Sequence, residues 1–557
     1  MSITMKSIAL NPLIWLILIA AILRIGWMET HYAIIEVEGG EYIRLAENIA
    51  AGQGYVGMRE HAGPQIYFPP LFPIGIAALS ALTHDYEIAG RAISIVAGIA
   101  LVPIMFALAL TLYGQTVAIT CAGLVALHPM MVALSGTLYS ESSFLTLLMG
   151  GIYLFVRIMQ ADTPTTAAIA GSGLLFGLAY LTRAEGFFIP FLLVGIIIIS
   201  HQTGLLQTRH YLRTATLLLA VFLLTAAPYI TWLTIQAGEL HVEGKSPLNF
   251  IVGNRINMGM SYPEAAYGID ENLKETGAFF GRDIDGFSTV KREVSTIPYV
   301  IGMVRANLRS RMGQVLRASE YGGPLLIILA CLGLAFSPWS KSRWSYDVLV
   351  GSVFAALLVM TSTTPIVYER YSISFFLPLA LWASAGILVI WNFSIPILPT
   401  SHRLNSPLTS YGPTFLSFII IGIITVSAIS PVEQLYSFSD SAPRHMIIKE
   451  AGTWIRQAQF ANHRIMAISL KVPYYAGAVQ ELFPGSSALL AIRYLERTSP
   501  DIVVLESRGL YRPYLRDWFE QGLPSPQFKK LKEFENMGHD KIVLYGHINQ
   551  LAPQPIQ

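Results

Sequence analysis

The sequence predicts a polytopic α-helical membrane protein with a small α/β domain at its C-terminal end. Of its 557 residues, 53% are hydrophobic and only 13% are charged, and the mean hydropathy is +0.52. An ordinary soluble domain contains about 25% charged residues. About eleven apolar stretches are long enough to cross a bilayer, and the composition becomes that of a soluble protein only from about Ser441. Together these observations predict a membrane domain followed by a soluble one.

The predicted spans are apolar segments of about 20 residues. They lie near residues 8–27, 88–112, 116–135, 141–158, 165–182, 186–200, 213–235, 322–337, 346–363, 371–392 and 414–434. The first is too long for the core of a signal peptide, so we expect it to be retained. A further block, Leu71 to Leu82, has only about 12 residues, and we expect it to lie at the membrane interface without crossing.

Basic residues in the short loops predict the orientation. If the N-terminus is cytoplasmic, that side collects Lys6, Arg157, Arg209, Arg213, Lys341, Arg343 and Arg403. This bias satisfies the positive-inside rule for a multi-pass protein of the plasma (inner) membrane. The odd number of spans then places outside a first loop with interfacial helices (29–87), a long loop (236–320) and an extracytoplasmic α/β domain (437–557), appended to a transmembrane domain of residues 1–436.

Carboxylates are concentrated in the first outer loop, where Glu36, Glu38 and Glu41 lie within six residues. Like charges this close repel one another, so a purely structural loop has little need of them. Apolar residues recur at helical spacing from 41 to 50 and Gly52 follows, which predicts a short amphipathic helix on the membrane surface. Acids also favour the first turn of a helix, so this structural explanation stands beside the functional one.

Three more polar clusters interrupt the apolar pattern. They are Tyr139-Ser140-Glu141-Ser142, Thr182-Arg183-Ala184-Glu185-Gly186 and Tyr368-Glu369-Arg370-Tyr371. Taken singly, each has a structural explanation, as a helix cap, a surface ion pair or an interfacial anchor. Independent caps and anchors would fall on both membrane faces, whereas the predicted topology brings all three to the face of the first outer loop. This convergence predicts one functional site at that face.

Other function classes have less support. The net charge of +2 and the absence of a dense basic block argue against a nucleic-acid partner, and Cys121 and Cys331 lack metal-ligand neighbours. The C-terminal pattern predicts helices near 447–455 and 487–498 and strands near 464–469, 501–506, 528–534 and 541–545. No Gly-rich phosphate loop accompanies them, so nucleotide binding is not indicated.

The order of these motifs resembles the GT-C glycosyltransferases. The resemblance rests on Glu38-Gly-Gly-Glu41-Tyr42, Gly52-x-Gly54-Tyr55 and Tyr67-Phe-Pro-Pro-Leu71 after the first apolar helix, and on the three later clusters. The closest branch is the bacterial relatives of protein O-mannosyltransferases and lipid A aminoarabinose transferases, similar to glycosyltransferase families 39 and 83. The similarity covers most of residues 8–435 in order.

This resemblance implies transfer of a sugar from a polyprenyl-phosphate carrier to a lipid, glycan or protein acceptor at the outer face, with inversion. The family's catalytic acid falls on Glu38, where the family usually has Asp, so Glu36 and Glu41 remain alternatives. Arg370 is implied as the ligand of the departing phosphate, with Arg183 and then Arg24 as further candidates.

The remaining site residues follow from the same resemblance. Glu141 is expected to bind substrate hydroxyls, or to hold a divalent cation (Mg or Mn) with Glu38, since metal dependence varies in the family. Acceptor or lipid contacts are expected from Tyr42, Tyr67, Glu185, Tyr371, Arg305 and Arg309. The two arginines share a helical face just before the eighth span, where anionic headgroups would attract them.

Two other classes remain. A lipid or sugar transporter or flippase would place ionisable residues near the membrane midplane and show repeated halves, whereas the acids here lie at predicted helix ends. A non-catalytic scaffold with a sensing domain would leave the convergence of the polar clusters unexplained. We therefore expect a membrane glycosyltransferase.

Overall fold

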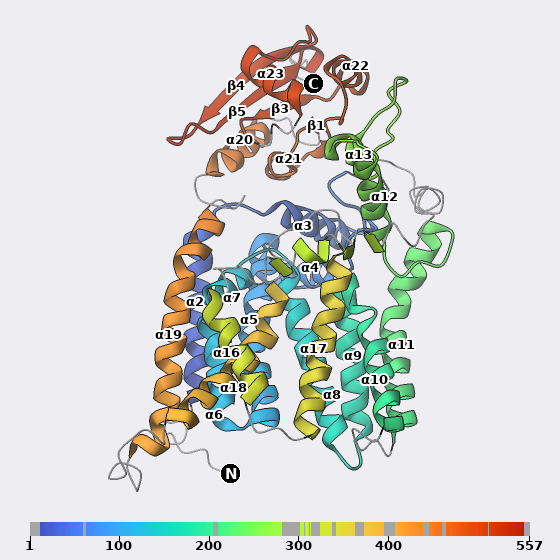
Figure 1. The fold of residues 1–557 in the computed structure, drawn as a ribbon. Helices are drawn as coiled ribbons and strands as arrows, with labels where there is room; N and C mark the ends of the chain where they lie inside the picture. Colours follow the sequence, from blue (N-terminus) through green and yellow to red (C-terminus); the bar gives the residue numbers. More distant parts are fainter. Residues whose placement is uncertain are drawn as a thin grey trace.

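The protein consists of a helical bundle with a small α/β domain above one end (Figure 1). The computed structural model describes residues 12–59, 63–203, 210–280, 301–313 except 303, 306 and 311, 323–336, 341–362, 373–394, 407–437, 445–458, and 464–550 except 509 and 511. Within these ranges, eight helices are long and apolar enough to cross a membrane, or nine if one bent pair counts as a single span. The multi-pass architecture predicted from the sequence is therefore confirmed.

The long helices account for most of the predicted spans. They are α2 (Pro12–His31), α5 (Tyr86–Tyr113), α8 (Glu141–Gln160), α10 (Ile189–Thr203) with the preceding η2 (Ala184–Gly186), α11 (Tyr211–Ala237), α17 (Lys341–Thr361), α18 (Phe376–Ser394) and α19 (Pro407–Ser437). The bent pair is α6 (Gln115–Leu127) and α7 (Pro129–Ser135), which meet at 57°. His128 between them is extended because a residue that precedes proline avoids the helical region.

Three apolar helices are shorter. Two of them, α9 (Thr166–Thr182) and α16 (Gly323–Phe336), coincide with predicted spans, and α4 (Leu71–Thr83) is the block expected at the interface. Close contact supports α16, because a Cβ added to Gly333 would lie 1.9 Å from the Trp382 carbonyl oxygen of α18. Small residues let helix backbones approach in this way within membranes. At 13 residues, α4 packs against α3 and α5.

The helix of the first outer loop, α3 (Val37–Ala50), begins four residues earlier than predicted. Glycine pairs weaken helices in isolation, but here a Cβ on Gly39 would lie 2.7 Å from Leu138 Cβ, and one on Gly40 2.2 Å from Leu470 Cδ1. The expected position of this helix at the membrane surface stays a prediction, and the structure adds that α3 packs on both sides. Its Tyr42 packs on α4 and its Ile43 packs on the C-terminal domain.

A five-stranded sheet forms the core of the C-terminal domain, with strand order β2-β1-β3-β5-β4. Its strands are β1 (Arg464–Met466), β2 (Val479–Glu481), β3 (Ile502–Glu506), β4 (Phe528–Glu535) and β5 (Lys541–His547); β1 pairs in parallel with β2 and β3, and β5 is antiparallel to β3 and β4. Its helices are α20 (Met446–Gln457), α21 (Lys471–Ala476), α22 (Ala488–Thr498), α23 (Pro513–Gln521) and η8 (Ile548–Gln550). The predicted apolar face of α20 is buried at Ile447, Ile448, Ala451 and Ile455.

The long outer loop forms a bridge between the bundle and this domain (Figure 1). It contains α12 (Ser246–Asn257) and α13 (Tyr262–Tyr267), although its sequence shows no sustained periodicity. After α13 the chain attaches to the domain, where Gly485 N donates to the Tyr267 carbonyl at 2.7 Å and the Tyr494 hydroxyl donates to Glu275 at 2.7 Å. The domain and this loop together cover one end of the bundle.

Candidate active site

The three acids at the start of α3 have different environments. Glu36 is buried and lies 3.3 Å from Arg91 Nη1 on α5, and its other oxygen accepts from Leu138 N at 3.3 Å. Burial raises the pKa of Glu36, and the Arg91 guanidinium opposes that shift. These contacts tie the first outer loop to α5 and to the turn before α8. Glu36 therefore has a structural role that keeps it from the cavity described below.

Glu41 is turned into its own loop. Its Oε2 accepts from Met58 N at 3.0 Å, and a Cβ on Gly57 would lie 2.4 Å from the same oxygen. Burial raises the pKa of Glu41, while the Met58 N–H group opposes the shift. A carboxyl group held this closely by backbone organises the turn that follows α3.

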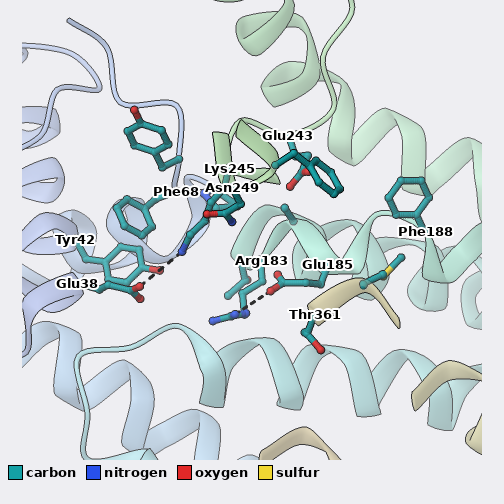
Figure 2. Close-up of a pocket in the computed structure, with 16 residues that line it drawn as sticks. Glu38, Tyr42, Phe68, Arg183, Glu185, Phe188, Glu243, Lys245, Asn249 and Thr361 are labelled. Carbon is teal, nitrogen blue, oxygen red and sulfur yellow. Dashed lines mark hydrogen bonds and ion pairs between the residues drawn. The ribbon is translucent and has the colours of Figure 1, made fainter. Parts of the chain in front are cut away.

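Glu38 differs from both neighbours because it faces a cavity. Its side chain is 21% exposed, and Oε1 lies 3.7 Å from Lys245 Nζ (Figure 2). This cavity, of about 300 Å³, we call the bundle-side cavity. Its walls are α3, residues 67–69, residues 182–185, the start of α12 and the end of α17. Of the three acids, Glu38 is the one that lines it.

Charged groups from two predicted clusters meet on the opposite wall. Arg183 Nη1 lies 2.8 Å from Glu141 and Nη2 lies 2.9 Å from Glu185. Arg183 can hold both because α9 ends at Thr182 and the chain turns through η2 before α10. The planar guanidinium suits such two-sided contact with carboxylates.

Tyr42 connects the two walls. Its hydroxyl lies 3.1 Å from Ser140 Oγ, one residue before Glu141. Burial, with a contribution from the carboxylates of Glu38 and Glu141, raises the pKa of Tyr42 above its ordinary value. The hydroxyl therefore stays protonated and can donate a hydrogen bond. The structure thus brings together the first outer loop and two of the three later clusters, and Tyr67 and Glu185 also line the cavity.

The sequence reasoning missed the contribution of the long outer loop. Glu243, Lys245 and Asn249 line the bundle-side cavity (Figure 2). They reach it because Gly244 packs on the first outer loop, where an added Cβ would lie 2.2 Å from the Ile66 carbonyl oxygen. The only sequence signal was Lys245-Ser246-Pro247, since proline is favoured in the first turn of a helix.

Arg24 is not placed where the sequence suggested a phosphate ligand. It does not line the bundle-side cavity, because it is fully buried in the bundle. Its guanidinium donates to the carbonyls of Val125 and Ala126 at 3.0 Å and to Ser135 Oγ at 3.2 Å. The bend between α6 and α7 leaves carbonyls without helical partners, and Arg24 satisfies them. We therefore withdraw it as a phosphate ligand.

Other predicted residues lie away from the cavity or beyond the described chain. Arg305 and Arg309 are exposed in a helical segment and do not line the bundle-side cavity. The Tyr368–Tyr371 cluster, with Arg370, lies outside the described residues. The roles suggested for these residues stay predictions.

The divalent cation expected from Glu38 and Glu141 stays a prediction. In this structure each of the two carboxylates contacts a cationic side chain, Lys245 or Arg183. Within the described part of the chain, no group of three or more His, Cys, Asp or Glu side chains could hold a metal ion. We therefore derive no chemical step through a metal.

An apolar groove adjoins the bundle-side cavity. It measures about 690 Å³ and is lined by α4, α5 and α8, from Leu71 and Leu79 to Val96 and Leu147. Thr182 lines both spaces, so the groove and the cavity meet next to Arg183.

Known proteins share parts of this sequence or its architecture. Residues 68–232 match the family model described as dolichyl-phosphate-mannose-protein mannosyltransferase. ArnT from Cupriavidus metallidurans, solved with undecaprenyl phosphate, is similar over 97% of this chain and 99% of its own, with 12% identity and a TM-score of 0.56. A comparison with curated protein sequences gives no match.

Two archaeal structures show the same likeness. The oligosaccharyltransferase AglB from Archaeoglobus fulgidus, in complex with an inhibitory peptide and a dolichol-phosphate, matches over 98% of this chain and 75% of its own, with 11% identity and a TM-score of 0.57. An Archaeoglobus fulgidus oligosaccharyltransferase in complex with Zn and sulfate matches over 89% of this chain and 67% of its own, with 13% identity and a TM-score of 0.56. At such identities the likeness concerns the fold.

Proposed function

We propose that this chain, whose fold is similar to that of GT-C membrane glycosyltransferases, transfers a sugar from a polyprenyl-phosphate carrier to an acceptor hydroxyl with Glu38 as the base. The observation that carries the proposal is the placement of Glu38 on one wall of the bundle-side cavity, with Lys245 beside it and Arg183 on the opposite wall. A base and cations around one small cavity suit a reaction in which a hydroxyl loses a proton while a phosphate departs.

In the proposed step, Glu38 removes the proton of the acceptor hydroxyl as its oxygen attacks the anomeric carbon. The new carbon–oxygen bond forms on the face opposite the phosphate, so the configuration inverts, and the electron pair of the broken bond leaves with the polyprenyl phosphate. Lys245 has to release Glu38 for this to occur. A flexible ammonium on a side chain that is 35% exposed can make that exchange.

The departing phosphate needs positive charge beside it. Arg183 is held in place by Glu141 and Glu185, which also offset its charge, so it supplies fixed N–H donors, whereas the Lys245 ammonium can move from Glu38 to the phosphate and bring positive charge. We propose that these two cations share the phosphate, with Arg370 as a further candidate from the sequence. Fixed donors aimed at developing negative charge are a general means of lowering a barrier.

The carrier's isoprenoid chain is assigned to the apolar groove. Its lining is almost entirely hydrocarbon, and it meets the bundle-side cavity at Thr182. A lipid whose tail occupied the groove would therefore present its phosphate near Arg183. Arg305 and Arg309 remain candidates for anionic headgroups along the entry route, each contributing on the order of 1 kcal/mol.

The bundle-side cavity is proposed to face the outside of the plasma membrane. The charge bias of the short loops supports this orientation. The length of α4 supports it too, because 13 residues are too few to cross the bilayer even along its normal, so α4 does not add a span that would reverse the later loops. The C-terminal domain lies at the same end of the bundle as α3 (Figure 1), so both would be extracytoplasmic.

The test is to purify the protein with native lipids and to identify the bound lipids by mass spectrometry. We expect polyprenyl phosphate or its sugar conjugate to be enriched, and we expect the enrichment to fall in the Lys245→Met variant. Equal amounts in an unrelated multi-pass protein purified from the same membranes would contradict the proposal.

A further inference from the structure

A second cavity lies on the other side of Glu38. It also measures about 300 Å³, and we call it the domain-side cavity because strand β2 and the segment after β1 form one of its walls. The first outer loop and the segment from α12 to Phe279 form the others. Glu38, Lys245, Asn249, Tyr67 and Phe68 line both cavities. Glu38 therefore stands in the partition between them.

We propose that the domain-side cavity binds the acceptor, and that the acceptor is a carbohydrate. The proposal rests on the glycosyl transfer proposed above, and it assigns a purpose to the C-terminal domain. If the donor enters from the bundle, its anomeric carbon is approached from the opposite side, and that side is where the domain-side cavity lies. A base in the partition can then accept a proton from one substrate while the other loses its phosphate.

The lining has the chemistry that recognises a sugar. The rings of Tyr67, Phe279, Tyr267 and Tyr262 form a continuous row, with successive centroids 6.1, 6.2 and 6.3 Å apart. Aromatic faces contact the C–H faces of a pyranose, and amide or guanidinium groups bond its hydroxyls. A volume of about 300 Å³ is at the lower end for a small-molecule site and suits the terminal residue of a glycan.

Polar groups are spaced around this aromatic row. Gln65 comes from the first outer loop, Asn249 from α12 and Gln480 from β2. Arg59 also lines the cavity, and its Nη2 donates to the Phe279 carbonyl at 2.9 Å, which fixes the guanidinium beside the aromatic row. Because these groups come from three separate segments, the cavity exists only when the domain is docked on the bundle.

The docking contacts are specific. The Tyr475 hydroxyl accepts from Ile35 N at 2.9 Å, and Arg44 donates to the Ala478 carbonyl at 3.3 Å. The domain therefore contacts the chain just before α3 and the middle of α3, the helix that carries Glu38. On the other side, Arg512 lies over the Tyr267 ring at 5.5 Å.

A peptide acceptor is less compatible with this geometry. Peptides often bind by adding a strand to an open sheet edge. Strand β2 is an edge strand, but Gln480 N already donates to the Met58 carbonyl at 3.0 Å, so the first outer loop covers this edge. A lipid tail would suit the apolar groove better than a cavity with two carboxylates, Arg59 and three amides.

The experiment is saturation-transfer NMR on the full-length protein in lipid nanodiscs. The probes are methyl hexopyranosides, an N-acetylhexosamine disaccharide, a Ser/Thr-rich peptide and a short-chain diacylglycerol. We expect the C–H protons of at least one sugar to receive saturation from aromatic side chains. The Tyr267→Ala and Tyr262→Ala variants should weaken that binding roughly fivefold to tenfold. Phe188 lines the bundle-side cavity but not the domain-side cavity, so Phe188→Ala should leave sugar binding unchanged.

Two variants guard against misfolding, because Tyr262 is more exposed than Tyr267 and its truncation disturbs less packing. Retained sugar binding in both variants, or saturation of the peptide or diacylglycerol that depends on Tyr262, would overturn the proposal, as would saturation of no sugar. Lipids bound to the same samples separate the two hypotheses. Enriched polyprenyl phosphate without sugar binding defeats only the acceptor assignment, whereas absence of that lipid defeats the proposed function.

Discussion

Lys245 Nζ lies 3.7 Å from Glu38 Oε1, although the two residues are separated by more than two hundred positions in the chain. The contact joins the first outer loop to the long outer loop at the bundle-side cavity. The Lys245 ammonium nitrogen also lies 5.6 Å from the centre of the Phe68 ring, so the same charged group faces both Glu38 and this ring. The central chemistry proposed here depends on this pair.

Replacing Lys245 with Met keeps the length of the side chain and removes its charge. We expect turnover to fall roughly tenfold to a hundredfold, the effect of losing a charged hydrogen bond to the phosphate. Turnover is measured as release of polyprenyl phosphate per protein. The matched control is Lys274→Met, an exposed lysine in the same loop, which should retain full activity. Equal activity in the two variants would remove Lys245 from the mechanism.

Replacing Arg183 with Lys preserves charge but loses the planar fork that holds Glu141 and Glu185 together. A lysine can satisfy one carboxylate well, so we expect about a tenfold loss of turnover with the protein still folded. Arg157→Lys, at an exposed position of α8, serves as the control. Unchanged turnover in Arg183→Lys would mean that Arg183 serves only as a local ion pair.

The packing of α16 on α18 makes a prediction about stability. Gly333→Ala would place a Cβ 1.9 Å from a backbone oxygen, so the helices must separate, at a cost of about 1–3 kcal/mol. Gly422→Ala in α19 is the matched control, because no atom lies within 4 Å of its added Cβ. Thermal unfolding in detergent should show a lower Tm for the first variant alone. Identical Tm values would contradict the close contact of these two helices.

The orientation can be tested with reporters fused after Gln557. We expect a reporter that needs an oxidising, extracytoplasmic compartment to be active and one that needs the cytoplasm to be silent. The reason is the excess of Lys and Arg in the short loops at the opposite end. The reverse pattern would mean that the bundle-side cavity faces the cytoplasm, which would contradict the proposed orientation.

Local patterns were sufficient for the membrane architecture. Hydropathy located the helices because a span is defined by its own apolar composition, and the exposed and buried faces of α20 follow its apolar repeat. The sequence also predicted that Glu141 and Arg183 lie at the same face, because both are at helix ends, and in the structure the two side chains are in contact. Such features depend on short stretches of sequence.

Long-range packing decided what the sequence did not predict. Lys245 and Asn249 reach the bundle-side cavity only because Gly244 packs on the Ile66 carbonyl, a contact that no local pattern encodes. Arg24 donates to backbone carbonyls that lose their helical partners where α6 bends, and its place in the first apolar segment did not indicate this contact. The start of α3 was missed because Gly39 and Gly40 disfavour a helix until Leu138 and Leu470 close over them. Strand β2, which has only three residues, was also not predicted.

The most direct test of the account compares Glu38→Gln with Glu41→Gln. Glutamine keeps the size of the side chain but cannot accept a proton, so Glu38→Gln should retain the lipid donor and transfer sugar roughly a hundredfold more slowly or worse. Glu41 also lines the domain-side cavity, so Glu41→Gln can raise the KM for the acceptor, but an amide oxygen can keep its contact with Met58, so its kcat should stay near the parent value. Near-normal kcat in Glu38→Gln, or a kcat in Glu41→Gln as low as that of Glu38→Gln, would contradict the assignment of Glu38 as the base.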